Sequence, residues 1–191
     1  MAAPERLQAL PDIDAALWRE LSRAVRDRHH AWRFATLATV SAQADGVHPE
    51  ARTVVLRDCD SAARTLLVYT DARSAKAQQA ECRPQGVLVV WSPALGWQLR
   101  LHVALVLHTS GLQVSSRWAQ LNLTPAAQDY MAPLPPGTPQ AAPGAPPPDR
   151  DSRSHFAVLE CQVQSTDWLE LHRDGHRRAR FDAEGARWLV P

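Results

Sequence analysis

The stretch from Trp97 to His108 constrains the fold more than any other part of this chain. Apolar and polar residues alternate along it, which is the pattern of a long β-strand with one buried face. The apolar face holds Trp97, Leu99, Leu101, Val103, Leu105 and Leu107. The other face holds Gln98, Arg100 and His102. The apolar face of this strand needs a core to pack against, so we expect a sheet-based domain.

Further strand-like runs flank this segment, and turn residues separate them. Before it, the predicted strands are Phe34–Val40, Arg52–Arg57, Thr65–Thr70 and Val87–Trp91. After it, they are Phe156–Gln164, Trp168–Leu171, Arg177–Phe181 and Trp188–Val190. Short connections such as Ala44-Asp45-Gly46 join successive strands as hairpins, which favours an antiparallel arrangement over alternating βαβ units. The predicted fold class is mainly β: an antiparallel barrel of six to eight strands with peripheral helices.

The predicted helices are peripheral to these strands. One covers about residues 12–29, with Asp12 as its expected cap. A second runs from about Arg73 to Arg83 and stops at Pro84. Two short ones are expected at Ser115–Leu123 and Pro125–Met131. Residues 133–148 are half proline and read as a surface loop. With 191 residues, the chain is predicted to form a single domain over 1–191.

Composition excludes several classes of function. The 21 basic and 20 acidic residues leave a net charge of +1, which gives no general attraction to nucleic acid or to a membrane surface. No apolar stretch is long enough to span a membrane, and no signal peptide is visible. Three widely spaced cysteines indicate neither a disulfide framework nor a zinc site, and they fit a cytoplasmic protein. His172 and His176 flank a predicted turn without a third ligand, so no metal site is predicted.

An anion-binding site is predicted where the Thr65–Thr70 strand passes into the following helix. Free backbone N–H groups at a helix N-terminus favour an anion, and Thr70, Ser74 and Lys76 add two hydroxyls and a cation. On its own, the segment also fits an ordinary capped helix with solvated cations. Two further cations, Arg52 and Arg57, bracket the apolar strand that precedes it, and they favour a phosphate as the ligand.

The ordered motifs of this region resemble a known family. They are Arg-x-Val-x-Leu-Arg from Arg52, then Tyr69-Thr70, Ser74-Ala75-Lys76, Trp91, and Gln98-Leu99-Arg100. Their order and spacing resemble the FMN-binding split barrels typified by pyridoxamine 5'-phosphate oxidase. The resemblance runs from Phe34 to about Thr109 and resumes from Phe156 to Pro191. It implies a split-barrel fold with FMN as the cofactor.

The resemblance also implies which residues hold FMN. The phosphate and ribityl chain are assigned to Arg52, Thr53, Val54, Val55, Leu56, Arg57, Tyr69, Thr70, Ser74 and Lys76. Gln98 is expected to reach a flavin held mainly by the other subunit, so the chain is predicted to form a homodimer with FMN sites at the interface. Arg180 is similar to an arginine that approaches the flavin ring. Ala75 departs from the family, which commonly has arginine there, and Arg73 is the expected replacement.

The substrate side departs further from the family. Arg177-Arg178-Ala179 stands where the oxidase has Arg-Leu-His, and residues 109–131 lack its substrate-phosphate motif. The prediction is therefore an FMN-dependent oxidoreductase acting on a small molecule that the sequence does not specify, with no catalytic residue assigned. The alternatives are a flavin-binding protein without turnover, or a barrel that binds the deazaflavin F420 or a haem-related ligand.

Overall fold

The structure is a computed structural model that describes residues 6–43, 46–140 and 155–191. Its strands form one antiparallel sheet of eight strands in the order β3-β2-β1-β4-β5-β6-β7-β8. The strands are β1 (Phe34–Gln43), β2 (Gly46–Asp60), β3 (Thr65–Asp71), β4 (Gln85–Ser92), β5 (Trp97–His108), β6 (Phe156–Glu170), β7 (Arg177–Asp182) and β8 (Gly185–Leu189). The helices are α1 (Leu10–Ala24), α2 (Ala75–Cys82) and α3 (Leu112–Leu121), with the short 3₁₀ turns η1 (Ala31–Arg33) and η2 (Pro125–Tyr130).

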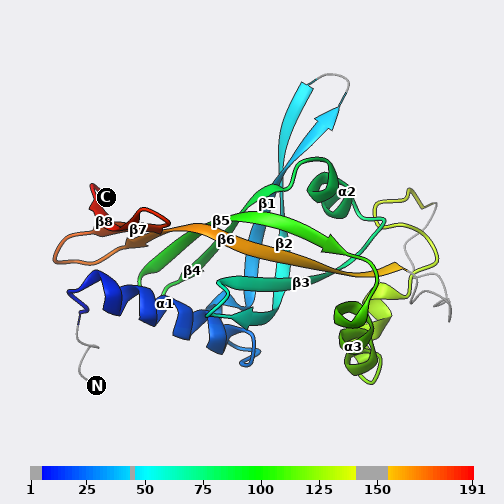
Figure 1. The fold of residues 1–191 in the computed structure, drawn as a ribbon, viewed down its shortest axis with the longest axis horizontal. Helices are drawn as coiled ribbons and strands as arrows, with labels where there is room; N and C mark the ends of the chain where they lie inside the picture. The colour runs from blue at the N-terminus through cyan, green and yellow to red at the C-terminus, as the bar shows by residue number, and fades with distance from the viewer. Residues whose placement is uncertain (1–5, 44–45, 141–154) are drawn as a thin grey trace.

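Pairing between β3 and β6 closes the first six strands of this order into a barrel. Residues 156–162 of β6 pair with β3, whereas residues 166–170 leave the barrel and pair with β7. One long strand therefore serves both the closed barrel and the β7–β8 extension (Figure 1). The predicted antiparallel, mainly β fold is confirmed.

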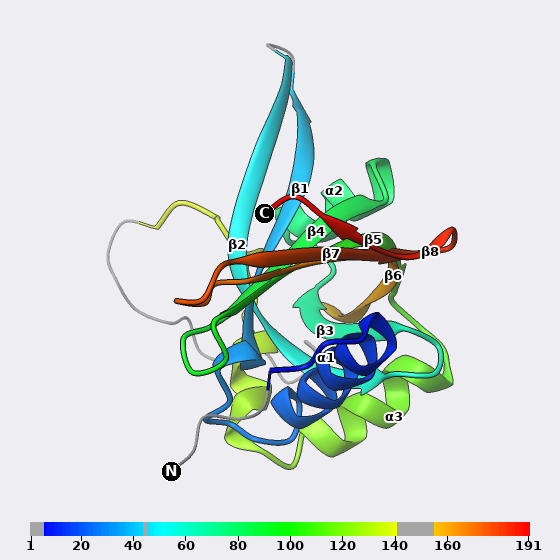
Figure 2. The same ribbon diagram turned by 90° about the vertical axis from the view of Figure 1, so that its left-hand side faces the viewer.

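The core fills the inside of the barrel and the space between the sheet and α1. The inner face of β5 contributes Leu99, Leu101 and Val103, which alternate with less buried residues as predicted. Helix α1 supplies Ile13 and Leu17, both without exposed surface. Two views show α1 lying beside the sheet and the outer half of the β1–β2 hairpin projecting from the body (Figures 1 and 2).

Several element boundaries differ from the predicted ones. Helix α1 begins at Leu10 and ends at Ala24, and its N-cap is Ala9 rather than Asp12. Pro11 explains the early start, because proline is favourable in the first turn, where its missing N–H has no partner to lose. The two strands predicted at Phe156–Gln164 and Trp168–Leu171 are one continuous strand, β6.

The other helical predictions hold with shifted bounds. Helix α2 begins at Ala75 and ends before Pro84 as predicted. Of the two short helices expected after β5, the second is a 3₁₀ turn over Pro125–Tyr130. The Ala44-Asp45 turn and residues 141–148 of the proline-rich segment lie outside the described residues. Within the described part of the chain, no helix has the length and apolar character needed to cross a membrane.

Candidate functional site

Arg52 anchors a polar cluster at one end of the barrel. Its guanidinium donates to the Thr39 hydroxyl and to Gln79 Oε1 at 3.0 Å, and it pairs with Glu50 at 3.0 Å. Gln79 and Thr39 are both buried and are joined by a 2.6 Å hydrogen bond. These contacts hold the cation in a fixed position between β1, β2 and α2.

Lys76 lies beside Arg52, in the first turn of α2. Burial and the nearby Arg52 charge lower the pKa of Lys76 below its ordinary value of 10.5, and Asp71 offsets part of this effect. Within the described residues Lys76 forms no ion pair. Two cations held this close without a shared carboxylate favour an anion between them. We call Arg52, Lys76, Thr70 and Ser74 the cation cradle.

The hydroxyls of the cation cradle lie at the start of the same helix. Ser74 is the N-cap residue of α2, and its hydroxyl is 3.0 Å from that of Thr70. Both residues are buried, and the N-cap makes no side-chain bond to the helix. The structure therefore brings four of the predicted phosphate-binding residues together.

Arg57 and Arg73 lie apart from this group. Arg57 is the extra residue of a β-bulge, because Leu56 pairs with Val68 and Asp58 with Leu67. Its guanidinium lies over the Tyr69 ring at 5.5 Å. Arg73, the expected replacement for the missing arginine, is bound to Asp71 at 2.6 Å and to the carbonyl groups of Ala132 and Pro133. Its hydrogen-bonding groups are directed to the segment after η2.

The remaining predicted residues of β2 divide between its two faces. Val54 and Leu56 are buried in the core, so only their backbone groups are available to a ligand. Thr53 is exposed on the opposite face, and Val55 is half-buried.

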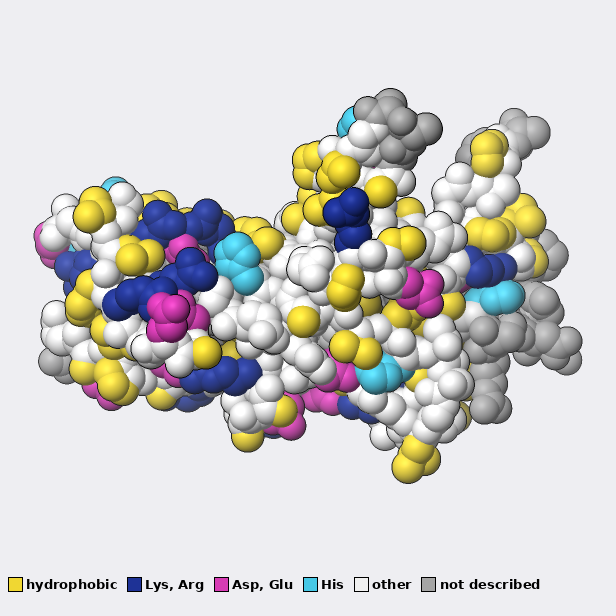
Figure 3. Space-filling view, turned by 45° about the horizontal axis from the view of Figure 1, so that its top comes forward, with side chains coloured by type: hydrophobic (Ala, Val, Ile, Leu, Met, Phe, Trp, Pro, Cys, Tyr) yellow, Lys and Arg dark blue, Asp and Glu magenta, His cyan; other side chains and the backbone are white. Residues whose placement is uncertain are grey.

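The outer face of the sheet carries the second group of predicted residues. Gln98 and Arg100 alternate with core residues on β5 and so share this face. Arg100 pairs with Asp167 at 2.6 Å, and Arg178 donates to the same carboxylate at 2.7 Å. Arg180 and Arg187 both pair with Asp182. Figure 3 shows Lys and Arg side chains gathered around Asp and Glu side chains at the left end of the molecule, which is the β7–β8 end in Figure 1.

Arg187 also pairs with Glu184 at 3.6 Å. Four arginines therefore face three carboxylates here, and the patch keeps a net positive charge. The hydrogen bonds from Arg178 and Arg100 hold the pKa of Asp167 below its ordinary value although burial acts the other way. Gln98 forms no side-chain hydrogen bond to another described residue, so its amide is available to a ligand. We call Gln98, Arg100, Arg178 and Arg180 the outer patch.

The cation cradle and the outer patch lie on opposite faces of the sheet. Arg52 belongs to a row of residues that lie opposite one another on successive strands and share the inner face. The other members are Leu37, Leu88, Leu101, Thr166, Phe181 and Ala186. The adjacent row is Thr53, Thr36, Val89, Arg100, Asp167, Arg180 and Arg187. Adjacent residues of a strand point to opposite faces. Within one copy of the chain, core side chains therefore separate the two groups.

Sequence reasoning missed two members of the Arg52 cluster. Gln79 lies three residues after Lys76, so both occupy the same side of α2, and this spacing was an available signal. Thr39 reaches Arg52 only through the β1–β2 register. No local pattern indicates that contact.

Comparisons with known proteins agree with this fold. The profile of the family described as "Pyridoxamine 5'-phosphate oxidase, FMN-binding domain" matches residues 15–109. A pyridoxamine 5'-phosphate oxidase-related, FMN-binding protein from Nostoc punctiforme PCC 73102 is similar, with 28% identity and a TM-score of 0.71. The alignment covers 93% of this chain and 96% of that one. The chain belongs to the pyridoxamine 5'-phosphate oxidase-like family.

Two other solved structures share the fold of this family at lower identity. PhzG from Burkholderia lata 383, in complex with tetrahydrophenazine-1-carboxylic acid, is 16% identical with a TM-score of 0.69, and the alignment covers 100% and 98% of the two chains. A heme binding protein from Mycobacterium smegmatis is 17% identical with a TM-score of 0.50, over 87% of this chain and 58% of that one. No curated protein matches the sequence.

Proposed function

We propose that the protein binds FMN in a site built by two copies of the chain and acts as an oxidoreductase on a small molecule. The observation that carries the proposal is the cation pair of Arg52 and Lys76, in which the pKa of Lys76 is lowered. A phosphate placed there gains two charge-assisted interactions and relieves the repulsion between the cations. The buried hydroxyls of Thr70 and Ser74 complete a phosphate-binding set.

The residues of the outer patch suit the ring end of a flavin. The Gln98 amide both donates and accepts, which matches the alternating groups of the flavin pyrimidine edge. Arg180 supplies a cation for negative charge that develops on a reduced ring. Since these groups lie on the face opposite the cation cradle, one FMN touches both only if a second copy supplies one of them. This argument supports a homodimer with shared sites.

When bound, FMN supplies the redox chemistry by accepting a hydride from the substrate. The chain's own residues hold the phosphate, orient the ring and supply positive charge beside it. The family membership and the similarity to the FMN-binding protein from Nostoc punctiforme favour FMN over a deazaflavin or a haem. Mass spectrometry of the extracted cofactor tests that choice, and recovery of F420 or haem in place of FMN contradicts it.

A complementation experiment tests the shared site. Lys76→Ala and the double variant Gln98→Ala/Arg180→Ala are expected to bind FMN weakly when each is pure. After the two are mixed and their subunits exchange, about a quarter of all sites carry both intact halves, because half of the dimers are mixed and each has one such site. FMN fluorescence quenching should recover to that extent. Sedimentation should show a dimer, and a monomer that still binds FMN contradicts the proposal.

The affinity for FMN is expected to fall at alkaline pH. Phosphate binding favours protonated Lys76, whose pKa in the free protein is lowered. As pH rises through that pKa, Lys76 loses its charge and the phosphate loses one partner. Lys76→Arg keeps its charge throughout, so it serves as the control for ionisation of the flavin itself. Dissociation constants measured from pH 7 upward should diverge between the two proteins, and parallel curves contradict a phosphate contact by Lys76.

Turnover is tested separately from binding. Bound flavin is mixed anaerobically with pyridoxamine 5'-phosphate or with NAD(P)H, and bleaching is followed by absorbance. Bleaching that oxygen reverses supports the oxidoreductase and identifies the class of electron donor. A flavin that neither donor reduces supports the alternative of a flavin-binding protein without turnover on these donors.

A further inference from the structure

A cavity of about 420 Å³ lies where the barrel splits. Along β6, pairing with β3 ends at Gln162, which lies opposite Thr65. Pairing of β6 with β7 begins at Thr166, which lies opposite Phe181. Gln164 is the extra residue of a β-bulge there, because His102 pairs with Ser165 and Val103 with Val163. Bulges of this kind occur next to binding sites. The cavity volume falls within the range of small-molecule pockets.

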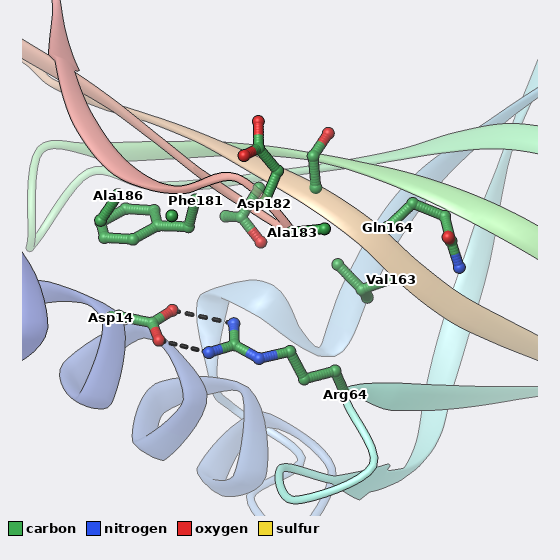
Figure 4. Close-up of a pocket in the computed structure, with 11 residues that line it drawn as sticks. Asp14, Arg64, Val163, Gln164, Phe181, Asp182, Ala183 and Ala186 are labelled. Atoms are coloured by element: carbon green, nitrogen blue, oxygen red, sulfur yellow. Dashed lines mark hydrogen bonds and ion pairs between the residues drawn. The ribbon is translucent and has the colours of Figure 1, made fainter.

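The wall of the cavity combines an apolar part with polar residues, among them the buried hydroxyl residues Ser165 and Thr166. The Ser165 hydroxyl accepts a hydrogen bond from Arg180 at 3.4 Å. Val163, Phe181, Ala183 and Ala186 line it, as Figure 4 shows. Thr166 also lines it and is only 1% exposed. Its Oγ1 has no hydrogen-bond partner among the described residues. A buried hydroxyl without a partner is unfavourable by itself, and a ligand that hydrogen-bonds to it removes that penalty.

The charges beside the cavity are already paired. Arg64 donates to both carboxylate oxygens of Asp14, at 3.0 and 2.5 Å (Figure 4). The same guanidinium lies over the Trp18 ring at 5.4 Å. Asp182 lies on the opposite side of the strands from this ion pair in Figure 4, and it is paired with Arg180 and Arg187. The cavity therefore offers no unpaired charge to an ionic ligand.

We propose that this cavity binds a small, uncharged aromatic molecule through a hydrogen bond to Thr166 Oγ1. The apolar part of the wall, with Phe181 and Val163, takes the ring, and a hydroxyl or amide group of the ligand pairs with the threonine. The site is separate from the cation cradle, since Leu101, Leu88 and Leu37 occupy the register positions between Thr166 and Arg52. The proposal does not depend on flavin binding.

Three probes of one shape test this site on the full-length protein by isothermal titration. 2-Naphthol carries the hydroxyl, 2-methylnaphthalene replaces it with a methyl group, and 2-naphthoate carries a negative charge. We expect 2-naphthol to bind about two- to tenfold more tightly than 2-methylnaphthalene, the value of one net hydrogen bond. 2-Naphthoate should bind most weakly, because Arg64 is already neutralised by Asp14. If 2-naphthol does not bind, or binds no better than the other two probes, the proposal is overturned.

Two variants locate the binding. Thr166→Val keeps the side-chain shape and should abolish the preference for 2-naphthol, while raising the melting temperature of the ligand-free protein. Ala186→Trp places a large side chain at the exposed rim and should block all three probes. Ala119→Trp, on the exposed surface of α3, is the matched control. Unchanged 2-naphthol affinity in both Thr166→Val and Ala186→Trp overturns the assignment to this cavity, as does a loss of binding in Ala119→Trp equal to that in Ala186→Trp.

Discussion

Replacing Arg52 and Lys76 together by alanine is expected to weaken FMN binding by at least about a hundredfold. Each residue offers the phosphate one charge-assisted contact, and such contacts contribute about 1.5–3 kcal/mol each. Their combined loss corresponds to roughly two to four orders of magnitude in the dissociation constant. Each single substitution should show a smaller part of this effect. The measurement is a titration followed by quenching of FMN fluorescence.

Riboflavin is the matched ligand for this prediction, because it has the flavin ring and ribityl chain without the phosphate. Its affinity should change little in the double variant, which separates a phosphate contact from general damage to the site. Arg83→Ala removes an exposed cation just after α2 and should leave FMN binding unchanged. Equal losses for FMN and riboflavin would show that the two cations maintain the local structure rather than hold the phosphate.

Trp168→Ala is expected to lower the free energy of unfolding by about 3–5 kcal/mol, the range for removing a large buried aromatic side chain. Trp168 has no exposed surface, and its ring meets Trp97 edge to face at 5.5 Å. The Arg177 guanidinium lies 5.5 Å from the centre of the same ring. Truncation leaves a cavity between β5, β6 and β7 that the surrounding strands cannot close. Denaturant unfolding measures the loss.

Trp188 provides the control for that measurement. It neighbours Trp168, with ring centres 6.3 Å apart, but it is 46% exposed. Trp188→Ala should therefore have a much smaller effect, in the range of about 1 kcal/mol or less that is usual for exposed positions. The loss of unfolding free energy in Trp168→Phe should lie between the losses in the two alanine variants. Phenylalanine keeps much of the side-chain volume, and the substitution removes an indole N–H that has no partner among the described residues. Similar losses for both alanine variants would contradict the assigned role of Trp168 in the core.

The parts of the fold that the sequence predicts well are those set by local pattern. The strand Trp97–His108 is observed with its predicted bounds, because its alternation extends over the whole segment. The continuity of β6 was missed because Ser165, Thr166 and Asp167 read as a polar break. In the structure, Thr166 and Asp167 are paired with β5 and β7 on either side, and the bulge at Gln164 keeps the strand in register.

The candidate site was predictable to a similar extent. Thr70, Ser74 and Lys76 are neighbours in sequence, and their placement at a helix N-terminus follows from the strand-to-helix pattern. The separation of Arg52 from Arg57 had an available signal, because residues five positions apart on a regular strand point to opposite faces. The bulge at Arg57 shifts the pairing with β3 only beyond that point. The Gln79 and Thr39 contacts of Arg52 depend on how α2 and β1 pack, which is a tertiary property.

The shared strand β6 has a consequence for how the protein opens. Its first half closes the barrel against β3, and its second half carries Asp167, which orients Arg100 and Arg178. Separation of β6 from β3 is therefore expected also to disturb Asp167 and the two arginines of the outer patch that pair with it. We therefore expect barrel closure and order at the outer patch to form one cooperative unit, whose backbone amides exchange with solvent through a common opening event.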